Sequence, residues 1–335
     1  MASIPSDQKP VRIGTRKSNL AVIQAQNIRR QLESAFPHRS FEIYALPTLG
    51  DKDQSTALYN FGDKSLWTTE LEELLTSGQL DIIVHCLKDM PNVLPATCEL
   101  AAIPARDDPR DALVIKTGLL YTTLASLPEG AVVGTSLVRR IAQLRRRYPK
   151  LRFANLRGNV ETRLAKVDRP ETEYSCMVMS TAGLQRVGLE HLITQYLGTQ
   201  DWGIMHAVGQ GALGLEIRRG DVAMKELLGV LGDERTTLAC TAERALMRTL
   251  EGGCSVPIGV ETAWLTDGEG VPASLEMAAL VVGLDGSQKV ESICRAEMKN
   301  LEEANDFGKR VAEQLLEAGA DAILRDINRD RPSKD

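Results

Sequence analysis

The sequence predicts an α/β fold with two similar lobes, followed by a smaller α+β domain. Strand-like and helical segments alternate through the first two thirds of the chain, which is the order that builds parallel sheets covered by helices. The last third differs, with one long helical segment, three strand-like runs and an amphipathic helix. Because 335 residues exceed one ordinary hydrophobic core, we expect more than one domain.

The first lobe is predicted from a β-α-β-α-β pattern. Apolar residues recur at helical spacing at Ala21, Ala25, Ile28, Leu32 and Ala35. A second helix is expected where Thr69 and Glu72 match a capping box, and Gly78 is expected to end it. The strands that flank these helices are expected at residues 11–14, 41–46 and 80–85.

The second lobe repeats this pattern in a strongly basic region. Its strands are expected at residues 131–134, 151–154 and 176–180, and its helices at residues 137–147 and 160–167. Ten Lys or Arg residues and one acid lie between Arg139 and Lys166, in a chain with a net charge of −5. Such a cluster attracts anions. Tyr148 and Phe153 are its only aromatic residues, too few for a nucleic-acid stacking platform, so polycarboxylate small molecules fit at least as well.

The third domain is predicted to display a cysteine on a loop. A helix is expected at residues 235–250, strands starting near residues 258, 275 and 289, and a helix at residues 301–316. Between the first helix and the first strand lies Glu251-Gly252-Gly253-Cys254, followed by Pro257. Paired glycines remove side chains that would block an approaching group, which favours covalent chemistry at Cys254. The competing interpretation is an inert, buried thiol.

A glycine-rich segment, Gly209-Gln210-Gly211-Ala212-Leu213-Gly214, matches the G-x-G-x-x-G pattern of dinucleotide-binding proteins. That pattern belongs between the first strand and the first helix of a Rossmann unit, whereas this segment follows both predicted lobes. We therefore interpret it as a connection between the lobes.

Composition excludes several classes of protein. The chain is 43% apolar and 25% charged, which is typical of a globular protein, and it has no apolar run of the roughly 20 residues that span a bilayer. The first residues lack a secretory or transit pattern, so we expect a cytoplasmic protein without a membrane partner. Six cysteines and four histidines are scattered without paired spacing, which predicts neither a disulfide framework nor a metal site.

Polar residues follow the predicted strands at the points where each strand ends. Ligands of open α/β sheets bind at these ends, and the planar fork of arginine suits carboxylates. Arg145, Arg146 and Arg147 are instead assigned to a solvent-exposed helix face. The residues predicted to bind an anionic ligand are Arg139, Arg140, Arg157 and Arg163.

Several of these motifs together resemble one family. The motifs are Val84-His85-Cys86-Leu87-Lys88-Asp89-Met90-Pro91, Leu156-Arg157-Gly158-Asn159 with Thr162-Arg163-Leu164, the segment 209–214 and Glu251-Gly252-Gly253-Cys254. In this order they are similar to hydroxymethylbilane synthase, also called porphobilinogen deaminase, from about Val11 to the last helix. The family's fold has two periplasmic-binding-protein-like (type II) lobes and a third domain that carries the cysteine. By this resemblance we expect the first lobe at residues 11–107 and 207–227, the second at residues 108–206, and the third domain at residues 228–335.

The resemblance implies an activity and a cofactor. Enzymes of the family are transferases of haem biosynthesis that join four porphobilinogen molecules head to tail, release ammonia and free hydroxymethylbilane with water. They do this on a dipyrromethane cofactor made from their own substrate, which Cys254 would hold through a thioether. Asp89 would be the main catalytic acid, and Lys88 a charged contact beside it. We also expect a monomer that binds no nucleic acid.

Further site residues follow from the family's positions. Contacts to the cofactor are implied for Ser18, Lys64, Lys88, Asp89, Thr135, Ser136, Arg139, Arg140, Arg157 and Arg163. Contacts to the substrate are implied for Arg16, Gln24 and Arg186.

The sequence departs from the family pattern in the immediate surroundings of the site. Thr69 stands where Lys is common, Leu137 and Cys86 where Ser is common, and Trp67 where Phe is frequent. The alternative is a non-catalytic two-lobed anion- or solute-binding protein, because such a protein would share the lobes and the strand-end arginines. The third domain with Cys254 and the absent export pattern argue against it.

Overall fold

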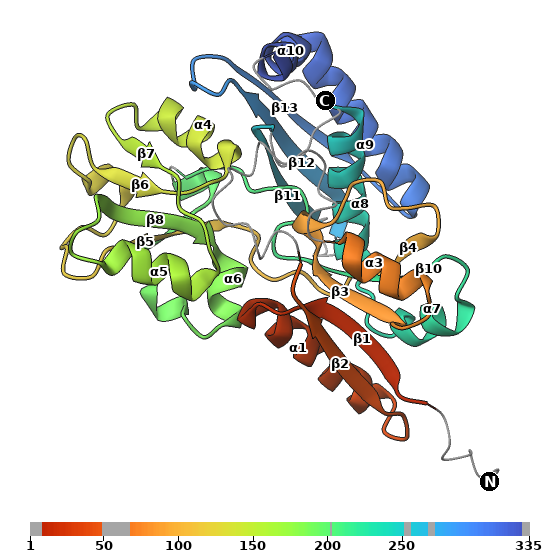
Figure 1. Ribbon diagram of the computed structural model, residues 1–335. Helices are drawn as coiled ribbons and strands as arrows, with labels where there is room; N and C mark the ends of the chain where they lie inside the picture. Colours follow the sequence, from red (N-terminus) through yellow and green to blue (C-terminus); the bar gives the residue numbers. More distant parts are fainter. Residues whose placement is uncertain (1–8, 49–67, 202, 251–255, 267–271, 330–335) are drawn as a thin grey trace.

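The computed structural model describes residues 9–48, 68–201, 203–250, 256–266 and 272–329. Figure 1 shows two α/β lobes and a third domain above the first lobe. No helix in these ranges is long and apolar enough to cross a membrane.

The first lobe is a five-stranded sheet with the order β2-β1-β3-β10-β4. Its strands are β1 (Val11–Arg16), β2 (Phe41–Leu46), β3 (Ile82–Cys86), β4 (Cys98–Ala102) and β10 (Leu213–Arg218). Helices α1 (Asn19–Ala35), α3 (Thr69–Thr76) and α7 (Val222–Gly229) belong to this lobe. Strands β1, β2 and β3 are parallel, as the β-α-β-α-β pattern predicts.

The second lobe is a five-stranded sheet with the order β7-β6-β8-β5-β9. Its strands are β5 (Asp111–Ile115), β6 (Val132–Gly134), β7 (Arg152–Ala154), β8 (Tyr174–Ser180) and β9 (Gln195–Leu197). Helices α4 (Val138–Arg147), α5 (Val160–Asp168) and α6 (Thr181–Arg186) complete this lobe. Apolar residues on both faces of the sheet form the two cores of this lobe.

The two sheets share one topology. In each sheet the fourth strand in spatial order, β10 or β5, directly follows a segment of chain that passes from one lobe to the other. Strand β10 runs antiparallel to β3 and β4, and β5 runs antiparallel to β8 and β9. The chain enters the second lobe through residues 103–110, the first crossing, and returns through residues 203–212, the second crossing. This duplicated arrangement is the predicted periplasmic-binding-protein-like fold. The residue boundaries of the domains stay a prediction.

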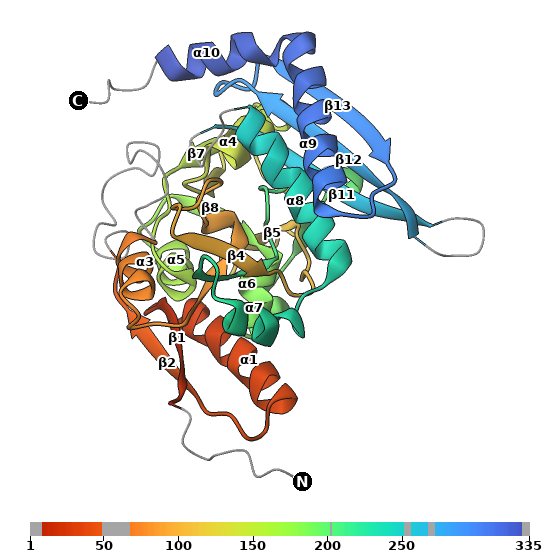
Figure 2. The same ribbon diagram turned by 90° about the vertical axis from the view of Figure 1, so that its right-hand side faces the viewer.

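The third domain packs helices against an antiparallel sheet. Strands β11 (Ile258–Thr266), β12 (Pro272–Val282) and β13 (Lys289–Ala296) form the sheet. Helices α8 (Glu234–Thr249), α9 (Leu301–Leu315) and α10 (Asp321–Arg329) accompany it, as Figure 2 shows. A Cβ atom on Gly308 would lie 2.0 Å from the carbonyl oxygen of Ala242. Glycine at this position therefore lets α8 and α9 pack backbone against backbone.

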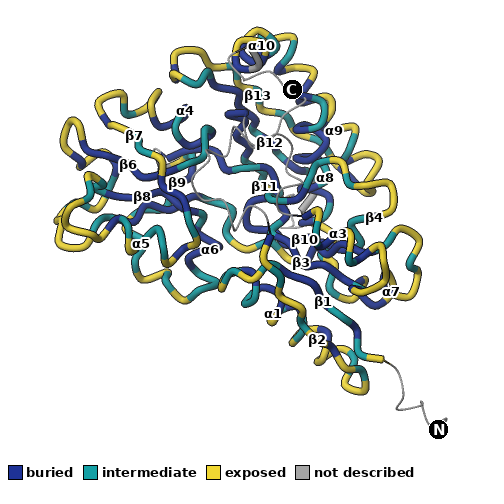
Figure 3. The backbone as a smooth tube through the Cα atoms, viewed as in Figure 1, coloured by how far each residue is buried: buried dark blue, intermediate teal, exposed yellow. Residues whose placement is uncertain are grey.

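The third domain also contacts the second lobe, through residues that the sequence assigned to solvent. Arg145 donates to the carbonyl oxygen of Leu284 at 3.1 Å, and Arg146 donates to the carbonyl oxygens of Gly286 and Ser287 at 3.1 and 3.0 Å. Both arginines are exposed, in keeping with the exposed stretches of chain around α4 in Figure 3. The assignment to a solvent-exposed helix face is confirmed. The same side chains also hold the turn between β12 and β13, which the sequence did not predict.

Two local predictions need correction. Thr68, not Thr69, is the N-cap of α3, and its side chain makes no capping hydrogen bond. The predicted capping box is therefore wrong, because Thr69 already lies inside the helix and its N-cap makes no side-chain hydrogen bond. The glycine-rich segment is a connection between the lobes only as far as Ala212, since β10 begins at Leu213. Strand β10 is hard to recognise in the sequence because Glu216 lies between Leu215 and Ile217 and all three are buried. A glutamate normally indicates an exposed position.

Candidate active site

The first lobe contributes a short turn that follows β3. Leu87–Asp89 form one turn of 3-10 helix, and the chain is extended again at Met90. No longer helix follows Asp89, as Pro91 predicts. Leu87 and Met90 are buried against Cys240 of α8, which fixes the turn from behind and leaves Lys88 and Asp89 partly exposed.

The second lobe contributes arginines from the ends of its parallel strands. Arg139 and Arg140 lie in the first turn of α4, which follows β6. Arg157 follows β7, and Arg163 lies on α5 after it. The side chains of Arg139, Arg140 and Arg157 are buried. Their placement follows from topology, because the carboxyl ends of adjacent parallel strands meet at one edge of a sheet.

These side chains form one electrostatic cluster across the two lobes. Burial and the charges of Arg140, Arg157 and Arg16 together lower the pKa of Arg163 to about 10, although the charge of Asp89 opposes the change. Burial also lowers the pKa of Lys88, against the opposing charge of Asp89. The Asp89 carboxylate thus interacts electrostatically with a cation of each lobe, Lys88 and Arg163, and the excess of positive charge suits a polyanionic ligand.

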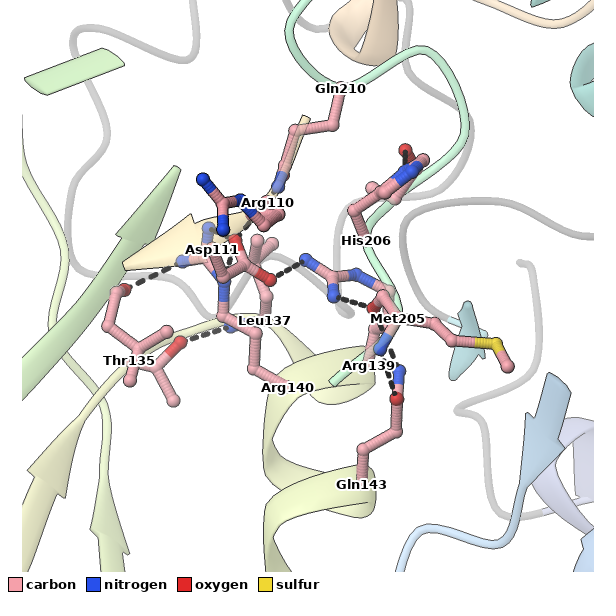
Figure 4. A network of polar contacts seen from close by, with 12 residues as sticks. Arg110, Asp111, Thr135, Leu137, Arg139, Arg140, Gln143, Met205, His206 and Gln210 are labelled. Atoms are coloured by element: carbon pink, nitrogen blue, oxygen red, sulfur yellow. Dashed lines mark hydrogen bonds and ion pairs between the residues drawn. The ribbon is translucent and has the colours of Figure 1, made fainter. Parts of the chain in front are cut away.

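Sequence reasoning missed the carboxylate at the centre of the arginine cluster. Asp111 is fully buried at the start of β5 and lies between Arg139 and Arg140, as Figure 4 shows. Its Oδ2 accepts from Arg139 Nη2 at 2.8 Å, and its Oδ1 accepts from Arg140 Nη2 at 2.7 Å and from Arg140 Nε at 3.1 Å. Burial would raise the pKa of Asp111, but the two arginines outweigh it and hold the pKa below its usual value. Asp111 therefore stays ionised and fixes both guanidinium groups.

A second buried ion pair joins the crossings to the third domain. Arg106 of the first crossing donates from Nη1 and Nη2 to the two carboxylate oxygens of Glu243 on α8, at 2.6 and 3.1 Å. The same carboxylate accepts from the backbone N–H of Gly209, in the second crossing, at 2.8 Å. Burial would raise the pKa of Glu243, but Arg106 lowers it overall. Both crossings are thus held to α8, the helix that precedes Cys254 in the sequence.

His206 is a buried neutral histidine in the second crossing. Its backbone pairs with Val260 of β11, and its Nδ1 lies 3.1 Å from the carbonyl oxygen of Ala207, so Nδ1 carries the proton. Nε2 is buried without a hydrogen-bond partner among the described residues. Burial, reinforced by Arg106, lowers the pKa of His206 to about 4.

We expect His206 to make the folded state sensitive to acid. The unfolded chain protonates this histidine near pH 6.5 and the folded chain only near pH 4, so stability is lost as the pH falls through this window, by about 3 kcal/mol. His206→Asn keeps a donor for Ala207 and removes the titration. Urea unfolding of both proteins between about pH 7 and about pH 4 should show a smaller loss of unfolding free energy in the variant. Equal losses would contradict the assignment.

The remaining predicted site residues lie at the strand ends of both lobes, except for two that the structure does not describe. The residues at the lobe 1 strand end are Arg16 at the end of β1, Ser18 at the N-cap of α1 and the buried Gln24. Gln24 lies 3.1 Å from Cys86 Sγ. Thr135 and Ser136 follow β6, and Ser136 Oγ is buried without a partner among the described residues. Lys64 and Cys254 lie outside the described residues.

Arg186 has a different environment from the other arginines. Its guanidinium donates to Asp107 at 2.8 Å and to the carbonyl oxygen of Gly211 at 2.6 Å. It therefore ties α6 to both crossings, and its predicted substrate contact stays a prediction. Within the ranges given above, no group of His, Cys, Asp or Glu side chains could hold a metal ion.

Comparison with known proteins decides the family. The family model described as porphobilinogen deaminase, dipyromethane cofactor binding domain, matches residues 11–226. The model of the porphobilinogen deaminase C-terminal domain matches residues 237–317. The chain belongs to the porphobilinogen deaminase family. The matched regions cover both lobes and most of the third domain, so the alternative of a non-catalytic solute-binding protein is not favoured.

Curated relatives agree over nearly the whole chain. Porphobilinogen deaminase of Yarrowia lipolytica is 51% identical over 328 residues, which cover 96% of this chain and 95% of that protein. Porphobilinogen deaminase of Saccharomyces cerevisiae is 47% identical over 324 residues, which cover 95% of this chain and 97% of that protein. Among solved structures, a substrate binding domain of a putative amino acid ABC transporter from Streptococcus pneumoniae has a TM-score of 0.40 at 10% identity, covering 66% of this chain and 91% of that one.

Proposed function

We propose that this porphobilinogen deaminase family member joins porphobilinogen molecules head to tail, releases ammonia and frees hydroxymethylbilane. The observation that carries the proposal is the set of arginines at the strand ends of the second lobe, of which Arg140 interacts electrostatically with Lys88 and Arg163 with Asp89 of the first lobe. Every pyrrole unit of the growing chain brings carboxylate side chains, and arginines at strand ends can bind them in bidentate fashion.

The residues at the site fit the dipyrromethane cofactor of the family. Its carboxylates match the guanidinium groups, and the buried hydroxyl of Ser136, without a partner among the described residues, is a further donor for them. We propose that Arg139, Arg140, Arg157 and Arg163 hold these carboxylates. Further cofactor contacts are proposed for Ser18, Lys64, Thr135, Ser136 and the covalent link at Cys254. When bound, the cofactor supplies the pyrrole to which the first substrate molecule is joined.

Asp89 is proposed to do the electrostatic work of the reaction. Loss of ammonia from the protonated aminomethyl group leaves a positive charge on the substrate pyrrole and its methylene carbon. A fixed carboxylate beside the pyrrole N–H stabilises that charge as it develops. Lys88 lies next to Asp89 in the same turn, and Arg163 of the second lobe interacts with the Asp89 charge.

The arginine cluster also supports the prediction that the chain binds no nucleic acid. The basic segment turns Arg139 and Arg140 inward to Asp111, and Arg145 and Arg146 toward carbonyl groups of the third domain. These side chains are therefore not arrayed for a phosphate backbone. The monomeric state and the cytoplasmic location stay predictions.

Intact mass spectrometry tests the covalent cofactor and the function together. We expect the purified chain, or the chain incubated with porphobilinogen, to be heavier than its sequence by two pyrrole units, because a thioether at Cys254 survives purification. Cys254→Ser should remove the increment. Cys86→Ser is the matched control, since it removes a thiol near the site that carries no cofactor in the proposal. A mass equal to the bare chain after incubation would refute the proposed function.

A further inference from the structure

Gln210 is hydrogen-bonded to side chains of both lobes, Lys88 in the first and Asp111 in the second. It is fully buried in the second crossing. It lies between Gly209 and Gly211, whose φ angles of +69° and +85° favour glycine. A Cβ atom on Gly209 would lie 3.2 Å from the backbone nitrogen of Lys88, and one on Gly211 would lie 2.5 Å from the carbonyl oxygen of Asp107. The two glycines thus let the loop press between the Lys88–Asp89 turn and the first crossing.

The side-chain amide of Gln210 is held at both ends. Its Nε2 donates to Asp111 Oδ1 at 2.9 Å and to the carbonyl oxygen of Pro109 at 2.7 Å. Its Oε1 accepts from Lys88 Nζ at 3.2 Å. The acceptors on one side and the ammonium on the other allow only one orientation of the amide. Figure 4 shows Gln210 above Asp111, on the chain that leads away from His206.

We propose that Gln210 is a positioning residue, which holds the Lys88 ammonium beside Asp89 and links it to the Arg139–Asp111–Arg140 cluster of the second lobe. The proposal rests on the proposed function, since it assumes that Lys88 and Asp89 act in the reaction. A lysine carries its charge on four flexible methylene groups, so one fixed acceptor restricts it strongly. The anionic Asp111 polarises the amide, which strengthens the bond to Lys88.

The proposal makes the protonation of Lys88 depend on Gln210. A carbonyl oxygen that accepts from the ammonium favours the charged form and raises its pKa, in opposition to the burial that lowers it. Removing this acceptor should therefore lower the pKa of Lys88 further. A residue that only filled space would leave that pKa unchanged.

A double-mutant cycle tests the link. Gln210→Met keeps the length of the side chain and removes both polar groups, and Lys88→Met removes the ammonium. In cofactor-loaded enzyme we expect Gln210→Met to lower kcat roughly tenfold or more in the wild-type background, and less than about twofold in the Lys88→Met background. Equal effects in both backgrounds would overturn the proposal. Gln210→Asn, too short to reach both partners, repeats the test if the Met variant does not fold.

Gln143→Met is the matched control. Gln143 is also a buried glutamine that both donates and accepts, but its two partners are the backbone groups of Met205. Its effect should be the same with and without Lys88. If Gln143→Met lowered kcat in the wild-type background but not in the Lys88→Met background, any buried glutamine between the lobes would be coupled to Lys88. That result would refute the specific role of Gln210.

A second measurement separates this inference from the proposed function. The pKa of Lys88 is determined from the pH dependence of its acylation rate, followed by peptide mass spectrometry, in the wild-type protein and in Gln210→Met. We expect a decrease of roughly half to one pH unit in the variant, and an unchanged pKa would refute the inference. The measurement needs no turnover, so it decides the role of Gln210 even if the protein does not consume porphobilinogen.

Discussion

Asp89→Asn is expected to lower turnover by roughly two to three orders of magnitude, the usual effect of removing one electrostatic stabiliser from an active site. The amide keeps the shape of the side chain but has no charge to offset the cation that forms when ammonia leaves. The protein should stay folded, because the packing of Leu87 and Met90 against Cys240, not the carboxylate, holds the turn.

The comparison must be made per cofactor-loaded molecule. Intact mass gives the loaded fraction, and a steady-state assay of porphobilinogen consumption gives the rate. Asp168→Asn is the control, since Asp168 is an exposed carboxylate at the end of α5 that accepts from the backbone N–H of Thr117. Near-normal turnover in loaded Asp89→Asn would show that the catalytic role belongs to another group.

Asp111→Ala is expected to destabilise the fold by about 3–5 kcal/mol, the cost of leaving buried charges without their partner. Asp111 is the carboxylate shared by Arg139 and Arg140, and all three side chains are buried. The change removes the counter-charge of two guanidinium groups at once. Urea unfolding followed by circular dichroism measures the loss.

Two controls separate this effect from an ordinary loss of an ion pair. Glu129→Ala breaks the exposed pair with Lys150, at 2.9 Å, and should cost less than about 1 kcal/mol. Asp111→Ala combined with Arg140→Met should recover part of the stability, because one of the uncompensated charges is removed as well. If Asp111→Ala alone were as stable as the wild-type protein, Arg139 and Arg140 would have found other partners, and the prediction would be wrong.

The strand-end residues could be predicted from the sequence because their position depends on local patterns. Lys88 and Asp89 follow a buried apolar strand, and Arg157 and Arg163 follow another strand of the same parallel type. The edge of a sheet where such strands end is fixed by chain direction alone. Family motifs then distinguished these residues from other charged positions.

Asp111 and Gln210 could not be predicted, because their roles arise from pairings between distant segments. Asp111 opens a five-residue strand whose partners, β8 and β9, lie far along the chain. Gln210 reaches Lys88 across 122 positions of sequence. Neither contact leaves a periodic signal. Lys64 and Cys254 lie outside the described residues, so their roles rest on the sequence and the family.

The crossings between the lobes also decide the order in which synthesis completes the sheets. All strands of the second sheet come from residues 111–197, whereas the first sheet needs residues 11–218. Since β10 lies between β3 and β4, a growing chain that has reached β9 carries two unpaired strand edges in its first lobe. Of the two lobes, the one that is translated first is therefore the second to receive its full set of strands. Until β10 is made, its open strand edges are exposed to wrong pairing on the ribosome.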